Sequence, residues 1–513
     1  MCVVQKYPPV SYRPSRRLGQ QLAPRFVTAA CIGALSSAAL AGGPAYMPPS
    51  SNLVYGDVTH GQRVMSASSN PAAAAADIVR DGGRAVSGTV LSGGAGLEYG
   101  NVDDLFEKID KLAQAFKPSD TDGSEPPPPG QDPGDKPGSG IDIDYILDML
   151  DPDVVAAAEE IAKEVTIQAA LLAVIAADGY GKAFVQADAP FVVGKPLLGG
   201  AWTFGVNWSG AAKAYGIAEA VDLDPDALRD TLEAALGTPG ASILPVSFES
   251  RIGDILTTID TLTGEVSVAL DNDSSLLTKS VQTTEINLGY SRQALPTSHG
   301  SLYLGAEARL YLMRLSRISV RFGDITDSDE LFDEIRDADY NNDTGIGFDL
   351  GALWVADHYQ LGAQITNVNE PEFTYPRGNL STYTRPETIN FLLRDQIYTA
   401  ERQLKFEGSV FSANRRWTAN MGIDANAAPD PIGDDYQWFT VSAGYATEKW
   451  WLPGVRAGYR KNLAGTELGY VGVGVTALKI LNIDIASAVD TVSISGKTLP
   501  RGLMASIGFQ IAW

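Results

Sequence analysis

The chain has 513 residues, 44% of them hydrophobic, and a formal net charge of −23. This length suits one large barrel with an accessory region, or two to three ordinary domains. Beyond the N-terminus the longest apolar stretch, 165–177, is about 13 residues long, whereas a membrane-spanning helix needs about 20. The composition therefore excludes a bundle of membrane-spanning helices, and the acidic surface argues against nucleic-acid binding, which draws on clustered Lys and Arg.

The first 41 residues follow the pattern of an export signal. Five basic residues and no acidic residue accompany the apolar run Phe26–Leu40, and Ala39-Leu40-Ala41 supplies a small-residue cleavage site. Arg16-Arg17 leaves a twin-arginine signal as an alternative, and Cys31 a lipoprotein signal, although no apolar stretch precedes Cys31. We expect an ordinary secretory signal that is cleaved after residue 41.

Cleavage would change two properties of the mature chain. Both cysteines, Cys2 and Cys31, lie in the removed segment, so disulfides, thiol catalysis and cysteine metal sites are not expected. Five of the 39 basic residues are removed as well, which leaves 34 against 62 acidic residues and a net charge of −28.

The remaining chain divides into segments of different composition. Residues 101–117 have the apolar spacing of an amphipathic helix, and 118–140 is rich in Pro, Gly and Asp, as linkers are. We expect these divisions: 42–100, hatch and first strand; 101–117, helix; 118–140, linker; 141–237, helical insertion with one or two strands; 238–513, main barrel.

From about Ala201 the hydrophobic period changes from 3.6 to 2, as in β-strands. Leu302, Leu304 and Ala306, for example, alternate with Tyr303, Gly305 and Glu307 along one run. Comparable runs occur at about 202–208, 282–292, 302–312, 346–354, 358–368, 404–411, 417–425, 437–446, 454–461, 467–477, 480–489 and 502–513. A soluble β-sandwich also alternates in this way and is the alternative to a barrel.

Three features favour a membrane barrel over a sandwich. Several runs are about 9–13 residues long, enough to cross a bilayer at a tilt, whereas soluble strands average about 5–6. All eight tryptophans lie between Trp202 and Trp513, as interfacial girdles require. The last run places Phe509, Ile511 and Trp513 on one face, a C-terminal pattern that the barrel-assembly machinery of outer membranes reads.

We therefore predict an all-β fold with helical N-terminal insertions: a transmembrane antiparallel β-barrel of 12–16 strands, about 14, with an N-terminal plug. Strands can cross lipid only in a closed barrel, because every backbone polar group must pair. Short connections such as Asn414-Arg415 would be periplasmic, and longer ones such as 321–343 and 370–401 would face outside.

Five charged residues fall on the polar phase of their strands: Glu307, Arg309, Asp349, Asp424 and Asp484. In a barrel they would face the lumen, where charges tune permeation or hold a plug through paired contacts. Ordinary filling of the lumen is the alternative interpretation.

No motif indicates a metal, a cofactor or catalysis. Asp337–Asp343 resembles a calcium-binding loop, but Asn342 and Phe348 stand where the EF-hand needs Gly and Glu. Gly496-Lys497-Thr498 lacks the preceding glycine of a phosphate-binding loop and is interpreted as a hairpin tip. The three histidines, His60, His299 and His358, show no metal spacing, and no G-x-S-x-G occurs. We expect a protein that is not an enzyme.

The stretch 344–376 resembles the outer-membrane proteins of the TraF plasmid-transfer-operon family. Its strand Gly345-x-Gly347-x-Asp349-Leu350-Gly351 is followed by a strand that closes in an Asn-rich turn, Asn367–Glu370. The helix 101–116 and the run from Gly458 to Trp513 carry the same resemblance. The Pro-rich insertion at 117–140 and the helical stretch after it depart from the family.

Ser69-Asn70-Pro71-Ala72 is more distantly similar to the hatch region of the FadL group, which transports long-chain fatty acids and aromatic hydrocarbons. This resemblance implies that Asn70, Pro71 and Ala72 belong to a plug that moves when ligand passes.

Together these patterns predict a non-enzymatic outer-membrane barrel linked to plasmid transfer by its family. The expected partners are outer-membrane lipid, the barrel-assembly machinery and conjugation or secretion proteins. The alternatives are a FadL-like channel for hydrophobic small molecules, a structural envelope component and a general porin.

Overall fold

The computed structural model describes residues 53–56, 58–59, 69–80, 88–103, 105, 108, 179–217, 219, 247–252, 254–260, 266–270, 272–322, 338–447 and 449–512. The predicted signal at 1–41, the linker at 118–140, most of the helix at 101–117, the helical part of 141–237, His60 and Trp513 lie outside these residues.

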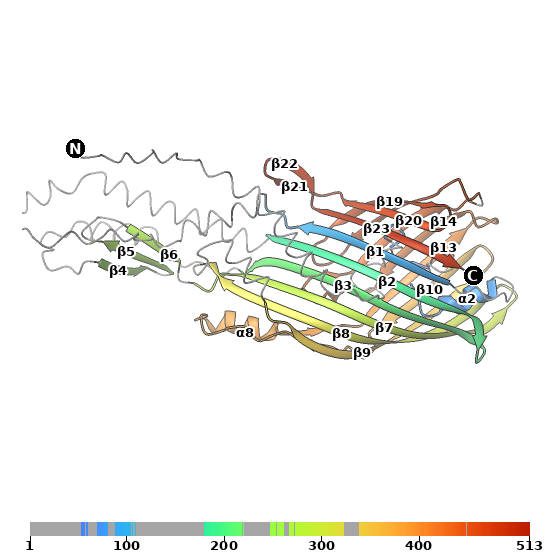
Figure 1. Cartoon of the computed structure of the whole chain (residues 1–513), viewed down its shortest axis with the longest axis horizontal. Coiled ribbons are helices and arrows are strands. Elements are labelled where there is room, and N and C mark those ends of the chain that lie inside the picture. The colour runs from blue at the N-terminus through green and yellow to red at the C-terminus, as the bar shows by residue number, and fades with distance from the viewer. Residues whose placement is uncertain are drawn as a thin grey trace, which may run out of the picture.

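Fourteen antiparallel strands form one closed barrel (Figure 1). In barrel order they are β1 (Gly88–Tyr99), β2 (Tyr180–Leu197), β3 (Gly200–Ile217), β7 (Ser275–Thr297), β8 (Gly300–Arg321), β9 (Asn341–Val355), β10 (Tyr359–Thr366), β13 (Gln403–Phe411), β14 (Trp417–Asp424), β17 (Trp438–Tyr445), β18 (Gly454–Asn462), β19 (Gly469–Ala477), β20 (Leu481–Ala488) and β23 (Gly502–Ala512). Pairing of β1 with β23, from Gly88↔Ala512 to Glu98↔Gly502, closes the ring. The predicted barrel of about 14 strands is confirmed.

Smaller elements lie in the connections. They are α2 (Ala73–Arg80), α8 (Pro386–Arg394), the sheet of β4 (Ser247–Ile252), β5 (Ile255–Asp260) and β6 (Val266–Leu270), and three two-stranded sheets: β11 (Glu372–Thr374) with β12 (Ile397–Thr399), β15 (Ala428–Pro429) with β16 (Asp435–Tyr436), and β21 (Thr491–Ile494) with β22 (Lys497–Pro500). Among the described residues no helix is long and apolar enough to span a membrane.

The two ends of the barrel differ. At the short-turn end, two-residue turns join β2 to β3 and β7 to β8, and α2 and the end of β23 lie there in Figure 1. At the long-loop end lie α8 and the β21–β22 hairpin. The β21–β22 turn is formed by Ser495 and Gly496, in the segment interpreted as a hairpin tip.

Alternation along each strand separates an apolar outer face from a polar inner face. On β19, Val471, Val473 and Val475 are exposed, whereas Tyr470 and the intervening glycines Gly472 and Gly474 are buried. Large apolar side chains are exposed in the same way on β8, β9, β20 and β23. The outer surface of the barrel is therefore apolar over most of the ring.

The strands from β2 to β9 are longer than the sequence pattern predicts. β7 has 23 residues and β8 has 22. Along the first half of β7, Ser275–Thr283, almost every residue is buried, so the alternation of a one-sided strand disappears there. The stretch 141–237 contributes β2 and β3, and the barrel begins at Gly88, inside the segment expected to hold the first strand.

Candidate functional site: the occupied lumen

The inside of the barrel is lined by charged and amide side chains. The buried polar residues on the inner phase of the strands include Glu98, Lys182, Gln186, Asn207, Lys213, Lys279, Glu285, Asp349, Glu407, Asn420, Arg456, Arg460, Asn482 and Asp484. Buried charges and amides are costly unless they are paired, so their partners show what occupies the lumen.

An N-terminal segment lies inside the barrel; we call its described residues, 53–56, 58–59 and 69–76, the hatch. Ala72–Ala76 are buried and pack in one cluster with Val90, Val192, Tyr303 and Leu353 of the wall. Asn70 forms the turn that leads into α2: its Oδ1 accepts a bond from Ala72 N and its carbonyl accepts one from Ala73 N, both 2.9 Å. A side-chain oxygen that accepts from the backbone N–H two residues on is the Asx turn that Asn favours.

Glu407 on β13 anchors the hatch. Its carboxylate accepts hydrogen bonds from Thr59 N (2.7 Å), Thr59 Oγ1 (2.7 Å) and Asn70 Nδ2 (3.0 Å). The Thr59 carbonyl in turn accepts bonds from Gln360 Nε2 (2.5 Å) and Ser409 Oγ (2.7 Å). One buried carboxylate thus binds two separate parts of the hatch.

Two wall glycines make room for the predicted hatch residues Asn70, Pro71 and Ala72. A Cβ at Gly305 would overlap the Pro71 carbonyl, and one at Gly351 would overlap Asn70 Oδ1. Only glycine permits this close approach of the hatch backbone to β8 and β9. The structure therefore places all three residues against the wall of the lumen.

The glycines of the β9 motif all face inward. A Cβ at Gly345 would lie 2.7 Å from the Phe373 ring, and one at Gly347 would lie 2.8 Å from Asn367 Oδ1. Asp349 Oδ1, on the same face, accepts a bond from Asn367 N (2.8 Å). The motif that carries the family resemblance thus forms the seat for the hatch and for the Asn-rich turn.

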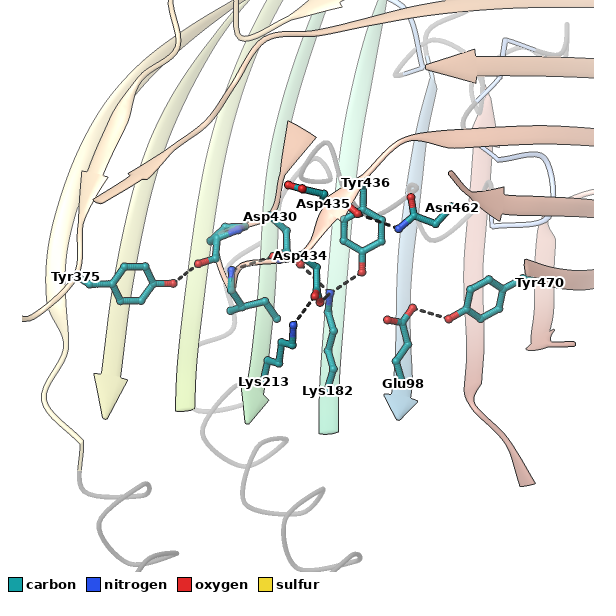
Figure 2. Close-up of polar contacts among 12 residues, drawn as sticks. Glu98, Lys182, Lys213, Tyr375, Asp430, Asp434, Asp435, Tyr436, Asn462 and Tyr470 are labelled. Atoms are coloured by element: carbon teal, nitrogen blue, oxygen red, sulfur yellow. Dashed lines mark hydrogen bonds and ion pairs between the residues drawn. The ribbon is translucent and has the colours of Figure 1, made fainter. Parts of the chain in front are cut away.

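At the long-loop end, the connection between β14 and β17 crosses the lumen; we call residues 425–437 the crossing loop. Lys182 Nζ on β2 binds Asp430 (2.7 Å), Asp434 (3.0 Å) and Tyr436 Oη (2.5 Å). Lys213 on β3 also binds Asp434. β2 and β3 lie on the opposite side of the ring from β14 and β17, and Figure 2 shows both lysines reaching the loop.

The two carboxylates of this cluster differ electrostatically. Burial raises the pKa of Asp430 above its ordinary value, against the attraction of Lys182. Burial also acts on Asp434, but the ammonium groups of Lys182 and Lys213 outweigh it and hold its pKa below the ordinary value. The ionised form of Asp434 is therefore the one that the two lysines stabilise, and it helps to hold the crossing loop in place.

A second loop, residues 367–402 with α8, packs on the wall beside the crossing loop. The Tyr375 hydroxyl donates to the Pro431 carbonyl and joins the two loops (Figure 2). Lys279 Nζ binds Asp395 (2.5 Å), and Asp273 accepts bonds from the backbone N–H groups of Thr384 and Arg385 just before α8. Both loops thus cover the lumen at the long-loop end.

The five predicted lumen residues all lie on the inner phase of their strands. Arg309 pairs with Asp349 (2.6 Å), Glu307 (3.2 Å) and Glu285 (3.4 Å). The other two make separate contacts: Asp424 accepts a bond from Trp438 N (2.7 Å), and Asp484 pairs with Arg456 (2.7 Å). The structure thus brings three of the five together.

The residues that hold the hatch and the crossing loop were not predicted from the sequence: Lys182, Lys213, Glu407, Asp430 and Asp434. Of the predicted C-terminal signal, Phe509 and Ile511 are exposed on the outer face. Among the described residues, no group of three or more His, Cys, Asp and Glu side chains is arranged to hold a metal ion.

The fold and its contents define a plugged antiparallel β-barrel. A family model described as "F plasmid transfer operon, TraF, protein" matches residues 67–424, more than two thirds of the chain. The chain belongs to this family, as the sequence resemblance implied. No curated protein matches the sequence.

Solved structures with a similar fold include the Pseudomonas putida toluene transporter TodX, with 12% identity, a TM-score of 0.38, and coverage of 92% of this chain and 98% of TodX. A TodX mutant titled a monoaromatic hydrocarbon channel has 12% identity, a TM-score of 0.36 and coverage of 86% and 92%. A mutant Rh. blastica porin has 9% identity, a TM-score of 0.22 and coverage of 83% and 100%. Similarity at this level carries no argument about what the lumen conducts.

Proposed function

We propose that this protein is a non-enzymatic outer-membrane barrel that acts as a gated channel for small solutes. The observation that carries the proposal is the combination of an apolar outer wall and a polar lumen that is occupied from both ends. A soluble barrel would not leave Val471, Val473 and Val475 exposed in a row on one strand.

Several features support placement in the outer membrane. Trp417 and Tyr445 pack together at the short-turn end, and Trp450 and Trp451 are exposed in the nearby connection between β17 and β18, as in an interfacial aromatic girdle. Export would use the signal at 1–41, and Phe509, Ile511 and Trp513 would present the strand that the barrel-assembly machinery reads.

Solute passage in this proposal requires movement of the hatch, including Asn70, Pro71 and Ala72. The hatch contacts the wall through a small group of hydrogen bonds around Glu407 and through alanine packing, with no ion pair to the wall among its described residues. Such contacts can be broken without unfolding the barrel, whose strands are tied by backbone pairing on both sides.

The direct test is solute uptake by liposomes that contain the purified, heat-modifiable protein. We expect faster uptake than by empty liposomes for at least one of two probes, a small hydrophilic solute or an apolar one. The hydrophilic probe corresponds to the polar lumen and the apolar probe to the FadL resemblance. Equal rates in protein-containing and empty liposomes for both probes would refute the channel.

A second candidate function is a role in plasmid transfer, favoured by the match to the TraF family model. The barrel would then be an envelope component that contacts conjugation or secretion proteins. Deletion of the gene from a donor strain should lower the conjugation frequency, and isolation of the barrel from membranes should recover transfer proteins. Unchanged conjugation together with no such partner would exclude this role.

A further inference from the structure

Arg460 occupies the space between the two closures of the lumen. It lies on the inner face of β18 and is only 4% exposed. Two residues before it, Gly458 faces the Val54 carbonyl of the hatch, which a Cβ at this glycine would overlap. Two residues after it, Asn462 Nδ2 donates to the Asp435 carbonyl of the crossing loop (2.9 Å). The guanidinium therefore lies between the hatch and the crossing loop.

This guanidinium stacks on an aromatic ring, and two of its nitrogens have no acceptor among the described residues. Its Cζ lies 3.7 Å from the centre of the Trp438 ring and 5.9 Å from that of Tyr470. Nε and Nη2 are buried, and neither has a hydrogen-bond partner among the described residues. Stacking on an aromatic ring stabilises a cation, but it does not satisfy N–H donors, and unsatisfied buried donors are costly.

Arg456, on the same face of the same strand, shows what the missing acceptor would be. Its Nε and Nη2 both lie 2.7 Å from Oδ1 of Asp484. These two nitrogens form one edge of the guanidinium plane, where parallel N–H bonds match the oxygens of a carboxylate or phosphate. Arg460 presents the same edge, and no carboxylate of the described chain is bonded to it.

Other polar atoms on the lumen wall are also left without partners. Glu98 Oε1 accepts a bond from Tyr470 Oη (2.5 Å), but its Oε2 has no hydrogen-bond partner in the part of the chain that the structure describes. Both amide atoms of Gln186 and of Asn207 are unpartnered among the described residues as well. Such a wall fits a hydrated, polar solute better than a hydrocarbon.

We propose that Arg460, stacked on Trp438, is a binding site for the oxyanion group of a small hydrophilic solute, a carboxylate or a phosphate. Nε and Nη2 are closed to solvent in the structure, so the anion reaches this edge only when the hatch or the crossing loop moves, and the solute then lies between the two. This inference rests on the proposed channel and names the class of solute that the channel takes.

Equilibrium binding to the purified full-length protein in detergent tests the site. The probes are sodium acetate and inorganic phosphate, with acetamide as the uncharged counterpart of acetate, and the readouts are calorimetry and tryptophan fluorescence. We expect saturable binding of acetate or phosphate and none of acetamide. The two anions distinguish a carboxylate site from a phosphate site.

Arg460→Met should weaken this binding by about tenfold or more, because it removes charge-assisted hydrogen bonds. Arg460→Lys keeps the charge without the two-pronged edge and should bind better than Arg460→Met but less well than the wild type. The control is Arg314→Met, which removes an arginine of β8 that bonds Gln282 of β7 rather than the hatch or the crossing loop, and it should leave binding unchanged. Heat-modifiable migration checks that each variant is folded.

The hatch could keep the anion from reaching Arg460. The titration is therefore repeated in Glu407→Gln, in which the contact between the hatch and Glu407 is weakened. The site is overturned if neither anion binds to the wild type or to Glu407→Gln, or if binding is unchanged in Arg460→Met. Binding requires no flux across a membrane. Retained binding without uptake by liposomes would therefore refute the channel alone, and uptake without binding would refute this site alone.

Discussion

Replacement of Glu407 by Gln should release the hatch while leaving the barrel intact. The carboxylate accepts three hydrogen bonds, two from Thr59 and one from Asn70. Glutamine has nearly the same volume but only one side-chain oxygen, so its NH2 group must face at least one donor of the hatch. The substitution thus removes charge-assisted bonds and adds a donor–donor contact.

The magnitude follows from the bonds lost. Hydrogen bonds to charged groups contribute about 1.5–3 kcal/mol each, and a neutral bond about 1 kcal/mol. Three charged bonds contribute about 4.5–9 kcal/mol, and the one amide oxygen that remains can keep two neutral bonds of about 1 kcal/mol each. The hatch contact should therefore weaken by about 2.5–7 kcal/mol, and the open population should rise at least about 70-fold.

Single-channel recording in planar bilayers measures this change as the frequency of open events. Glu98→Gln is the matched control: Glu98 is also a buried lumen glutamate, but it accepts a hydrogen bond from Tyr470, on the wall. We expect frequent openings in Glu407→Gln and wild-type behaviour in Glu98→Gln. Equal open frequencies in Glu407→Gln and the wild type would refute the account of Glu407 as the hatch anchor.

A disulfide between the hatch and the wall should suppress the openings that Glu407→Gln adds. A Cβ at Gly422 would lie 2.8 Å from Val58 Cγ2 of the hatch, which is close to the spacing that a disulfide requires. In a Val58→Cys/Gly422→Cys/Glu407→Gln protein, oxidation should abolish the added openings and reduction should restore them. Openings that persist under oxidation would mean that conduction does not pass the hatch.

Three further predictions concern the crossing loop, the hatch seat and the outer wall. Because the pKa of Asp434 is held below its ordinary value, its stabilising contribution is present above about pH 3.9 and is lost as the pH falls through its lowered pKa. Protonation of Asp430, whose pKa burial raises, comes earlier and favours the buried state. The crossing loop should therefore resist protease between pH 7 and about 4 and become cleavable only in stronger acid. The loop of Asp434→Asn should be cleavable already at pH 7. Cleavage of the wild-type loop near pH 6 would contradict the role given to Asp434. Gly351→Val should displace Asn70 and raise conductance, because a Cβ there overlaps Asn70 Oδ1; the variant fails the prediction if its conductance matches the wild type. Val473→Arg, at a 60% exposed position of the outer face, should lower the free energy of unfolding from vesicles by about 2–4 kcal/mol, and an unchanged guanidinium midpoint would argue against contact with lipid.

The sequence predicts the wall of this protein better than its contents. The alternation of apolar and polar residues can be recognised within a single strand. It therefore assigns Glu307, Arg309 and Asp349 to the inner face even when the residues that contact them are unknown. The same pattern predicted the number of strands closely. It did not locate β2, because Phe184 faces inward beside Lys182 and Gln186, and apolar residues on both faces hide the period.

The contacts that occupy the lumen join residues far apart in the chain. Lys182 and Asp430 are separated by 248 positions, and Thr59 and Glu407 by 348. Asp430 and Asp434 stand beside Pro431 and Gly433, so locally they have the appearance of a solvated turn. The crossing loop can reach Lys182 only because closure of the ring places β2 opposite β14 and β17.

The central claim, that the wall separates lipid outside from a polar lumen inside, can be tested residue by residue along β23. Single cysteines at positions 503–507, in protein without Cys2 and Cys31, would carry a small fluorophore in vesicles of brominated lipid. The account predicts strong quenching at Leu503, Ala505 and Ile507, which are exposed, and weak quenching at Met504 and Ser506, which are buried. Uniform quenching, or none at all five positions, would contradict it.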